Sequence, residues 1–209
     1  VPSRNFTGFG TGFLDYDNDG WLDIIVANGA AHIMPELART GDPFPLHQTN
    51  QLFRNLGGTG FEETTSGAGE VFELSEVSRG VAIGDVDNDG DPDVLLTNNN
   101  GRARLLVNTV GNRNSWIGFR IVDETGRTDV PGARVEVVPT DGPTVWRTVR
   151  RAASYLSSND PRVLVGLGDR SSVAVVRVHW PDGVIEEWTD PAVDRYLVLK
   201  RGAGREVDG

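Results

Sequence analysis

The 209-residue chain contains no cysteine. Disulfide bonds, zinc sites built on thiolates and catalysis by a thiol nucleophile are therefore excluded. Its apolar runs are short, and none approaches the roughly 20 residues that a helix needs to cross a bilayer. We therefore expect no transmembrane segment, and no signal peptide is visible. The chain begins with Val1 and not with methionine, so we expect a processed or truncated product.

Basic residues are also scarce, because 20 of them face 30 acidic residues and the formal net charge is −10. Lys200 is the single lysine, and no stretch gathers arginines into a stripe that would neutralise phosphates. This composition argues against a nucleic-acid partner. The acidity is local, since two short aspartate-rich segments hold most of the excess negative charge.

Glycine and proline, in contrast, are abundant, with 26 and 11 residues. They divide the chain into short, valine-rich apolar runs, and such runs between turn residues are typical of β-strands. We therefore predict an all-β fold.

Two nine-residue segments share one pattern, which is DYDNDGWLD in the first loop (Asp15–Asp23) and DVDNDGDPD in the second loop (Asp85–Asp93). Aspartates occupy positions 1, 3, 5 and 9, and glycine at position 6 permits a sharp turn. Alternate carboxylates that converge on one point suit Ca²⁺, which takes about six to eight oxygens, and position 7 commonly adds its backbone carbonyl. The predicted ligands of two Ca²⁺ ions are Asp15, Asp17, Asp19, Trp21 and Asp23 in the first loop and Asp85, Asp87, Asp89, Asp91 and Asp93 in the second.

The loops differ from EF-hands, which place a bidentate glutamate at position 12. Val26 and Leu96 occupy that position here. The flanking stretches LDIIVANG and PDVLLTNNN have strand character, and Pro92 argues against a helix leaving the second loop. We therefore interpret both segments as calcium loops between β-strands.

Each loop lies between a glycine-rich strand pattern and an apolar one, so the two copies form a repeat. The first copy continues into NQLFRNLGGTGFEETT and predicts four short strands, with turns at Asn28-Gly29 and Gly57-Gly58. Four strands per repeat are typical of a β-propeller blade. The second copy ends in ARLLVN and has no counterpart of the GFEETT stretch.

The two copies resemble FG-GAP/VCBS repeats, the calcium-bearing propeller blades also found in integrin alpha subunits. The remainder, from about Trp116 to Lys200, is similar to the ASPIC/UnbV domain that follows such repeats in cartilage-acidic-protein-like proteins. The matching stretches are PGARVEV (131–137), SYLSSND (154–160), VGLG (165–168) and VRVHWPDG (176–183). The chain thus resembles the C-terminal part of such a protein, and the resemblance implies calcium sites on the aspartates of both loops.

The C-terminal part has strand character independently of this resemblance. Val176, Val178 and Trp180 alternate with polar residues, and Asp141-Gly142 and Asp182-Gly183 are hairpin signals. We expect two blades at residues 1–112, followed by a small β-sandwich or barrel at 113–205.

A long segment, AAHIMPELARTGDPFPLHQ, interrupts the first copy after its second strand. Long loops are often functional, so we expect a variable contact surface here, with a short helix or turn within Ile33–Arg39. The residues that would pack on a partner are Met34, Pro35, Phe44 and Pro45. For His32 and His47, solvated positions are favoured over a transition-metal pair.

The remaining candidate groups have ordinary interpretations. The serines of SYLSSND have no histidine nearby in sequence to activate them. The pairs Glu62/Glu63 and Glu186/Glu187 point to opposite sides of their strands, so we interpret them as mostly exposed residues and not as glycosidase acids. Four tryptophans are expected in the core, with a sugar-stacking platform as the alternative, and these are Trp116, Trp146, Trp180 and Trp188.

Two blades cannot close a propeller ring, so we expect an open edge and an apolar face that needs cover. By alternation this face includes Ile24, Val26, Val94 and Leu96. We expect the C-terminal domain to cover part of the second blade, and a protein partner or missing N-terminal blades to cover the rest.

The favoured function is a non-catalytic, calcium-binding structural or interaction module outside the cytoplasm, either periplasmic or secreted. Millimolar calcium outside the cytoplasm suits loops of this kind. The module would be an extrinsic subunit or a fragment of a larger protein or assembly. Two alternatives stay open: a carbohydrate-binding or adhesion module, and part of a calcium-dependent propeller enzyme.

Overall fold

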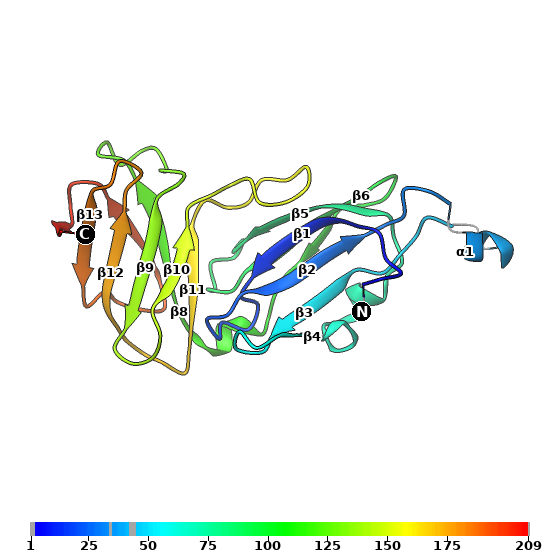
Figure 1. The fold of residues 1–209 in the computed structure, drawn as a ribbon, viewed down its shortest axis with the longest axis horizontal. Coiled ribbons are helices and arrows are strands. Elements are labelled where there is room, and N and C mark those ends of the chain that lie inside the picture. The colour runs from blue at the N-terminus through cyan, green and yellow to red at the C-terminus, as the bar shows by residue number, and fades with distance from the viewer. Residues whose placement is uncertain (1–2, 34, 42–44, 209) are drawn as a thin grey trace.

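The computed structural model describes residues 3–33, 35–41 and 45–208. Within these ranges the regular structure is dominated by strands, and the predicted all-β fold is confirmed. Figure 1 shows an elongated molecule with propeller-type sheets at one end and a β-sandwich at the other.

The long insertion of the first copy carries the one α-helix of the described residues, α1 (Pro35–Arg39), and this confirms the short helix predicted there. Met34 and Phe44, which we expected on a contact surface, lie outside the described residues. Pro35 is exposed and Pro45 is half-buried, and their contact with a partner stays a prediction. No described helix has the length and apolar character needed to cross a membrane.

Blade 1 is a four-stranded sheet of antiparallel neighbours in chain order, which confirms the four strands predicted for the first copy. Its strands are β1 (Gly8–Leu14), β2 (Asp23–Asn28), β3 (Gln51–Asn55) and β4 (Phe61–Glu63). Gly57 and Gly58 form the turn between β3 and β4 with φ angles of 62° and 80°, a region that glycine enters without strain.

Blade 2 has three antiparallel strands, in agreement with the missing counterpart of the GFEETT stretch. Its strands are β5 (Ser78–Gly84), β6 (Asp93–Asn98) and β7 (Arg104–Leu106). Short 3₁₀ helices precede and follow the blade: η1 (Thr65–Gly67) and η2 (Glu70–Glu73) before it, and η3 (Gly111–Arg113) after it.

One apolar core joins the two blades, and both sheets contribute to it. Its buried members are Leu14, Ile25, Ala27, Leu52, Phe72, Val81, Val94 and Leu96. Glycines allow the innermost strands to approach closely, because a Cβ on Gly10 would lie 2.5 Å from the backbone carbonyl oxygen of Arg79. The glycine-rich pattern before the first loop therefore reflects blade-to-blade contact.

The predicted open face is only half correct. Ile24 and Val26 do lie on the outer face of blade 1 and stay half-buried, but Val94 and Leu96 are buried against blade 1. Equivalent faces of two stacked repeats point the same way, so the face that is open in blade 1 is covered in blade 2. The exposed side chains of Phe13 and Phe61 extend the open face of blade 1.

The C-terminal unit is a sandwich of a five-stranded and a three-stranded sheet, and not a closed barrel. The five-stranded sheet has the order β10 (Val145–Thr148), β9 (Arg134–Pro139), β12 (Val173–His179), β13 (Ile185–Thr189) and β15 (Arg205–Glu206). The three-stranded sheet has the order β11 (Val163–Gly168), β8 (Ser115–Val122) and β14 (Tyr196–Lys200).

The inner faces of these sheets share one core that includes Phe119, Val165 and Val176. The predicted alternation is confirmed, because Val178 and Trp180 are buried as well. Both predicted hairpins are confirmed, since β9 pairs with β10 and β12 pairs with β13 in antiparallel register. The sheets change between β7 and β8, and the division into domains at 1–112 and 113–205 stays a prediction.

Two side-chain expectations in this unit are wrong. Glu186 and Glu187 are buried, because residues close to the C-terminus cover them: the Gly202 N–H donates to Glu186, and Arg205 forms an ion pair with Glu187. Trp146 is exposed, because β10 is an edge strand and only the side chains on its other face meet the core.

The predicted cover of blade 2 by the C-terminal unit is present. The segment between β10 and β11, yellow in Figure 1, reaches across to β5. The N–H of Asp160 donates to the Ile83 carbonyl at 2.9 Å, and the Ile83 N–H donates to Oδ1 of Asn159 at 3.0 Å. This segment therefore gives hydrogen-bond partners to backbone groups at the free edge of β5. Without them, this edge of an open blade could pair with another chain.

We expect Asn159→Ala to lower the free energy of unfolding by about 1–2 kcal/mol, because it leaves the half-buried Ile83 N–H without its acceptor. Urea unfolding measures the change. Ser158→Ala, at the exposed neighbouring position, is the control and should change stability by less than about 0.5 kcal/mol. Equal effects of the two substitutions would contradict the edge-capping role.

Candidate metal centre

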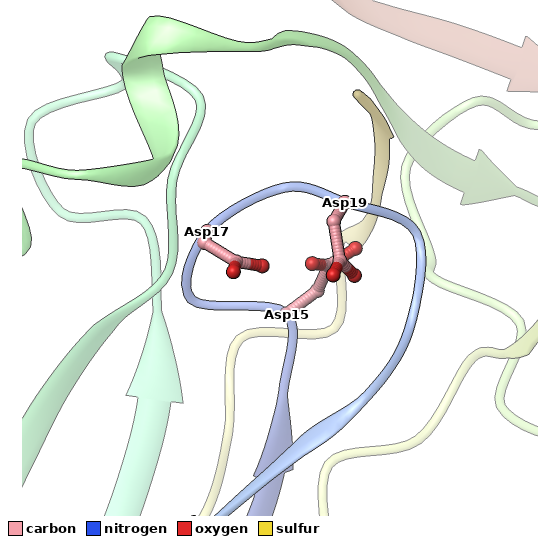
Figure 2. Close-up of side chains that lie close together, drawn as sticks. All are labelled: Asp15, Asp17 and Asp19. Atoms are coloured by element: carbon pink, nitrogen blue, oxygen red, sulfur yellow. The ribbon is translucent and has the colours of Figure 1, made fainter. Parts of the chain in front are cut away.

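The first loop brings three of its aspartates together. Asp15, Asp17 and Asp19 each offer a carboxylate oxygen, and these oxygens lie within 4.8 Å of one another. Figure 2 shows the three side chains pointing into the bend of the loop. Asp15 directly follows β1 and Asp23 begins β2, so the loop is the turn of a β-hairpin.

The local sequence explains the bend. Asn18 and Gly20 take positive φ angles of 53° and 96°, which asparagine and glycine tolerate better than other residues. Oδ2 of Asp15 accepts a hydrogen bond from the Gly20 N–H at 2.9 Å, and Oδ1 of Asp19 accepts one from the Trp21 N–H at 2.8 Å. The same carboxylates therefore shape the loop and leave further oxygens for a cation.

The fourth aspartate of the first loop lies outside the group of three. Both oxygens of Asp23 accept backbone N–H bonds, from Asn55 at 2.7 Å and from Tyr16 at 3.0 Å. Asp23 thereby fastens the loop to β3. Its part as a metal ligand stays a prediction.

The second loop repeats this geometry. Asp85, Asp87 and Asp89 form the equivalent group of three, and the Gly90 N–H donates to Oδ2 of Asp85 at 3.0 Å. Asp93 accepts N–H bonds from Val86 and Asn108, each at 2.8 Å, as Asp23 does in the first loop. No other group of three or more metal-ligating side chains occurs within the described ranges.

Position 7 differs between the loops. Its predicted role is a backbone carbonyl, so the side chain is free to vary. The Trp21 side chain is largely exposed, whereas Asp91 is buried and accepts a hydrogen bond from the Asn112 N–H at 3.0 Å. Gly111 permits this contact, because a Cβ there would lie 2.6 Å from the Cβ of Asp91.

The electrostatics of both loops call for a cation. Burial raises the pKa of Asp15 and of Asp23 to about 7, and neighbouring aspartates add to the effect. Burial likewise raises the pKa of Asp91 to about 7. Protein cations compensate only in part, since Arg54 lies 2.8 Å from Asp17 and Arg147 lies 3.8 Å from Asp15.

Buried oxygens without a hydrogen-bond partner identify the same places. Among the described residues they include Oδ1 of Asp15, Asp17 and Asp85. An unpaired buried carboxylate oxygen is costly, and a hard divalent cation satisfies it without a proton. The donor set contains oxygen alone, which fits Ca²⁺ better than zinc or copper.

The two loops touch each other, which the sequence did not reveal. Asn18 is fully buried, and its side-chain amide donates to the Gly90 carbonyl at 2.8 Å and to the Gly111 carbonyl at 3.0 Å. Its own carbonyl accepts a hydrogen bond from the Gly168 N–H at 2.7 Å. Asn18 therefore joins both loops to the sandwich.

The VGLG stretch (165–168) of the sandwich contacts Asn18. A Cβ on Gly166 would lie 2.4 Å from the backbone of Asn18, so a larger residue there would push the first loop away from β11. Gly168 takes a φ of 64° and presents its N–H to Asn18.

The sandwich contacts the second loop through two further side chains. The Tyr196 hydroxyl donates to Oδ2 of Asp85 at 2.9 Å. Arg162 donates to the Asp85 carbonyl and to Oδ1 of Asn88, each at 2.6 Å. Both loops thus lie at the junction of the blades and the sandwich.

Comparison with known proteins agrees with this architecture. Residues 15–96 match the family model described as an FG-GAP-like repeat, and residues 123–206 match the one described as ASPIC and UnbV. The resemblance predicted from the sequence is confirmed: the chain carries FG-GAP-like repeats followed by an ASPIC/UnbV domain. FG-GAP repeats are generally calcium-binding, and both groups of three aspartates are able to hold a metal ion.

Two curated relatives are named cartilage acidic protein 1, one from Mus musculus and one from Homo sapiens. Each is 28% identical to this chain over 177 residues, which cover 81% of the chain. The matched region covers 25% of the mouse protein and 24% of the human one, so the chain spans about a quarter of their length.

We expect the calcium-free protein to lose stability as the pH rises from about 4 to about 7. In this window folded Asp15, Asp23 and Asp91 keep protons that the unfolded chain has released, because burial raises each pKa from 3.8 to about 7. The free energy of unfolding then falls as the pH rises. Urea unfolding of chelator-treated protein at several pH values measures it.

Asp91→Asn provides the matched variant, since its side chain is not a predicted ligand. Its calcium-free stability should depend less steeply on pH than that of the wild type. In saturating calcium the trend should reverse, because bound aspartates are deprotonated. A calcium-free stability that is flat or rising over this window would contradict the burial argument.

Proposed function

We propose that the chain is a calcium-stabilised, non-catalytic interaction module that acts outside the cytoplasm. Two Ca²⁺ ions, one in each loop, hold the blades and the sandwich together. The observation that carries the proposal is the position of both aspartate groups at this junction, with buried carboxylate oxygens that lack a protein partner.

The proposed ligands are the predicted ones. In each loop, positions 1, 3 and 5 already converge, and position 9 and the carbonyl at position 7 would complete the shell. Arg54, which pairs with Asp17 and lies 3.6 Å from Asp19, would move aside or share these carboxylates with the ion. An ion that cancels the repulsion within each loop stabilises the folded state alone.

An ion at each loop would also support the sandwich. The loops carry the backbone carbonyls that Arg147 and Arg162 bind, at Gly20 and at Asp85. If a loop loses its shape, these acceptors move away from the sandwich. Calcium would therefore stiffen the connection between the two units as well as each blade.

The location outside the cytoplasm is supported by the relatives, whose name refers to cartilage, and by the millimolar calcium available there. The open outer face of blade 1 supports an interaction role. There the exposed Phe13 and Phe61 flank the half-buried Ile24, Val26 and Phe53, and a partner of any origin would remove this apolar area from water.

Titration calorimetry of the chelator-treated chain should show two bound Ca²⁺ ions. Asp87→Ala should reduce this number to one, because it removes an exposed ligand of the second loop without disturbing the core. Asp141→Ala, a highly exposed acid outside both loops, should leave two. Calcium at a hundred times its dissociation constant should add about 2.7 kcal/mol per site to stability. Absence of calcium uptake, with melting unchanged by chelator, would refute the proposal.

Asn18→Gly should lower the free energy of unfolding by about 2–3 kcal/mol, because it removes two buried hydrogen bonds and leaves the Gly90 and Gly111 carbonyls unsatisfied. Asn88→Gly is the matched control at the same loop position. It has a similar positive φ, and its exposed side chain accepts one hydrogen bond, from Arg162, which water can replace. The substitution should therefore cost less than about 1 kcal/mol. Denaturant unfolding in calcium compares the two, and similar losses would contradict the joining role of Asn18.

A further inference from the structure

We propose that the groove between the first loop and β10 binds an acidic oligosaccharide, with its sugar rings packed against Trp21 and Trp146. This inference deepens the proposed interaction role and rests on it, because the first loop forms one wall of the groove. It concerns side chains that the proposed calcium sites do not use.

The groove is a hollow of about 300 Å³, lined by Trp21 and Leu22 from blade 1 and by Pro143, Trp146 and Arg170 from the sandwich. This volume lies at the lower end of the range for ligand pockets. Its lining combines apolar surface with a few polar groups, as binding sites for small molecules do.

The two tryptophans are unusually exposed for such large side chains, at 43% for Trp21 and 40% for Trp146. Each is nonetheless supported by its own unit. The Trp21 ring lies against Gly58, where a Cβ would be 2.9 Å from the ring. The Arg134 guanidinium lies over the Trp146 ring, 4.6 Å from the ring centre. Supported aromatic rings in a hollow offer a flat binding surface at little entropic cost.

The charge of the groove is locally positive although the chain is acidic. Arg147 and Arg170 line it, and the Nε of Arg147 is buried without a partner. The acids that face them lie further away than a close ion pair, with Asp15 at 3.8 Å from Arg147 and Asp141 at 4.0 Å from Arg170. Asp19 is the acid in this hollow, and its carboxylate accepts the Trp21 N–H and lies near Arg54.

A second hollow, of about 290 Å³, adjoins the first, since both are lined by Leu22, Trp146 and Arg147. It adds Arg134, whose guanidinium contacts the Trp146 ring, and Arg150, whose guanidinium forms no hydrogen bond or ion pair with any residue that the structure describes. Its acids are committed elsewhere: Asp160 pairs with Arg162, and Asp15 and Asp85 are proposed calcium ligands. Arginines therefore continue the groove, and Arg150 is the one among them that is free to bind an anion.

This combination specifies the ligand class. The apolar face of a sugar ring packs on tryptophan, while its hydroxyl and anionic groups point to the rim. Guanidinium groups bind planar carboxylates and other oxyanions through paired N–H donors. Two adjoining hollows suit several linked rings. A carboxylate or a sulfate would satisfy the arginines equally, so the shared chemistry is a saccharide that carries oxyanions.

Calorimetry with the whole chain in millimolar calcium tests the proposal. The probes are a glucuronate-containing hexasaccharide, a sulfated dextran oligosaccharide, a neutral glucan hexasaccharide and a glutamate-rich peptide. We expect at least one acidic saccharide to bind at least tenfold more tightly than the neutral one and the peptide. The preferred acidic probe identifies the anion. Equal binding of the neutral saccharide, tighter binding of the peptide, or no binding of either acidic saccharide would overturn the proposal.

Substitutions locate the site. Trp21→Ala and Trp146→Ala should each weaken binding at least tenfold, and Arg150→Gln about threefold to fivefold with a smaller dependence on salt. Tyr155→Ala and Arg127→Gln remove an exposed aromatic ring and an exposed arginine outside the groove, and they should have no effect. Loss of binding in these controls, or unchanged binding in the tryptophan variants, would overturn the assignment to this groove.

Calcium uptake of the same samples separates the two proposals. Trp146→Ala should still bind two Ca²⁺ ions, because Trp146 lies on β10, outside both loops. Two bound ions without saccharide binding would overturn the groove alone. Failure of calcium uptake would instead overturn the proposed function.

Discussion

Carboxylates that share a small, water-poor volume cannot all stay ionised unless a cation joins them. This constraint governs the junction of the molecule. Both groups of three aspartates lie where the blades meet the sandwich, and burial raises the pKa of Asp15 at the heart of the first one. The polypeptide supplies arginines nearby, but they leave buried oxygens unpaired. The same loops carry the carbonyls and amides that hold the sandwich, so the state of the loops and the arrangement of the two units are coupled.

The stretches that resemble an ASPIC/UnbV domain have physical roles at this junction. Two glycines of VGLG accept Asn18 of the first loop, one through its small size and one through its positive φ. SYLSSND lies across β5, where its last two residues bond to Ile83. Short motifs in the sandwich are thus explained by the blades that they contact.

Local chemistry made much of the fold predictable. Asp-Gly hairpins, alternating valines and the aspartate spacing each depend on a few consecutive residues, and the structure agrees with the strands that they indicate. Contacts between distant segments were not predictable. Asn18 and Asn88 share a loop position, yet only Asn18 is buried, because Asn18 is enclosed by the second loop, η3 and β11. Glu187 is buried partly through Arg205, a residue of a later strand. Trp146 lies outside the core because its side chain is on the outer face of the sheet beside Glu136, and which face is covered depends on the whole sandwich.

Under the two proposals, the repeated loops would share one role, metal binding, and the first loop would have acquired a second one. The proposed ion takes side-chain oxygens from positions 1, 3, 5 and 9, so these positions are constrained in both copies. At position 7 it takes the backbone carbonyl, which every residue has. The side chain at this position can therefore vary with the surface that it faces. In the second loop that neighbour is η3, and Asp91 turns inward to accept the Asn112 N–H. In the first loop the neighbouring surface is β10 across a groove, and Trp21 turns outward. Ligand recognition can therefore diverge at position 7 while metal binding is retained, because the two depend on different atoms of the same residue.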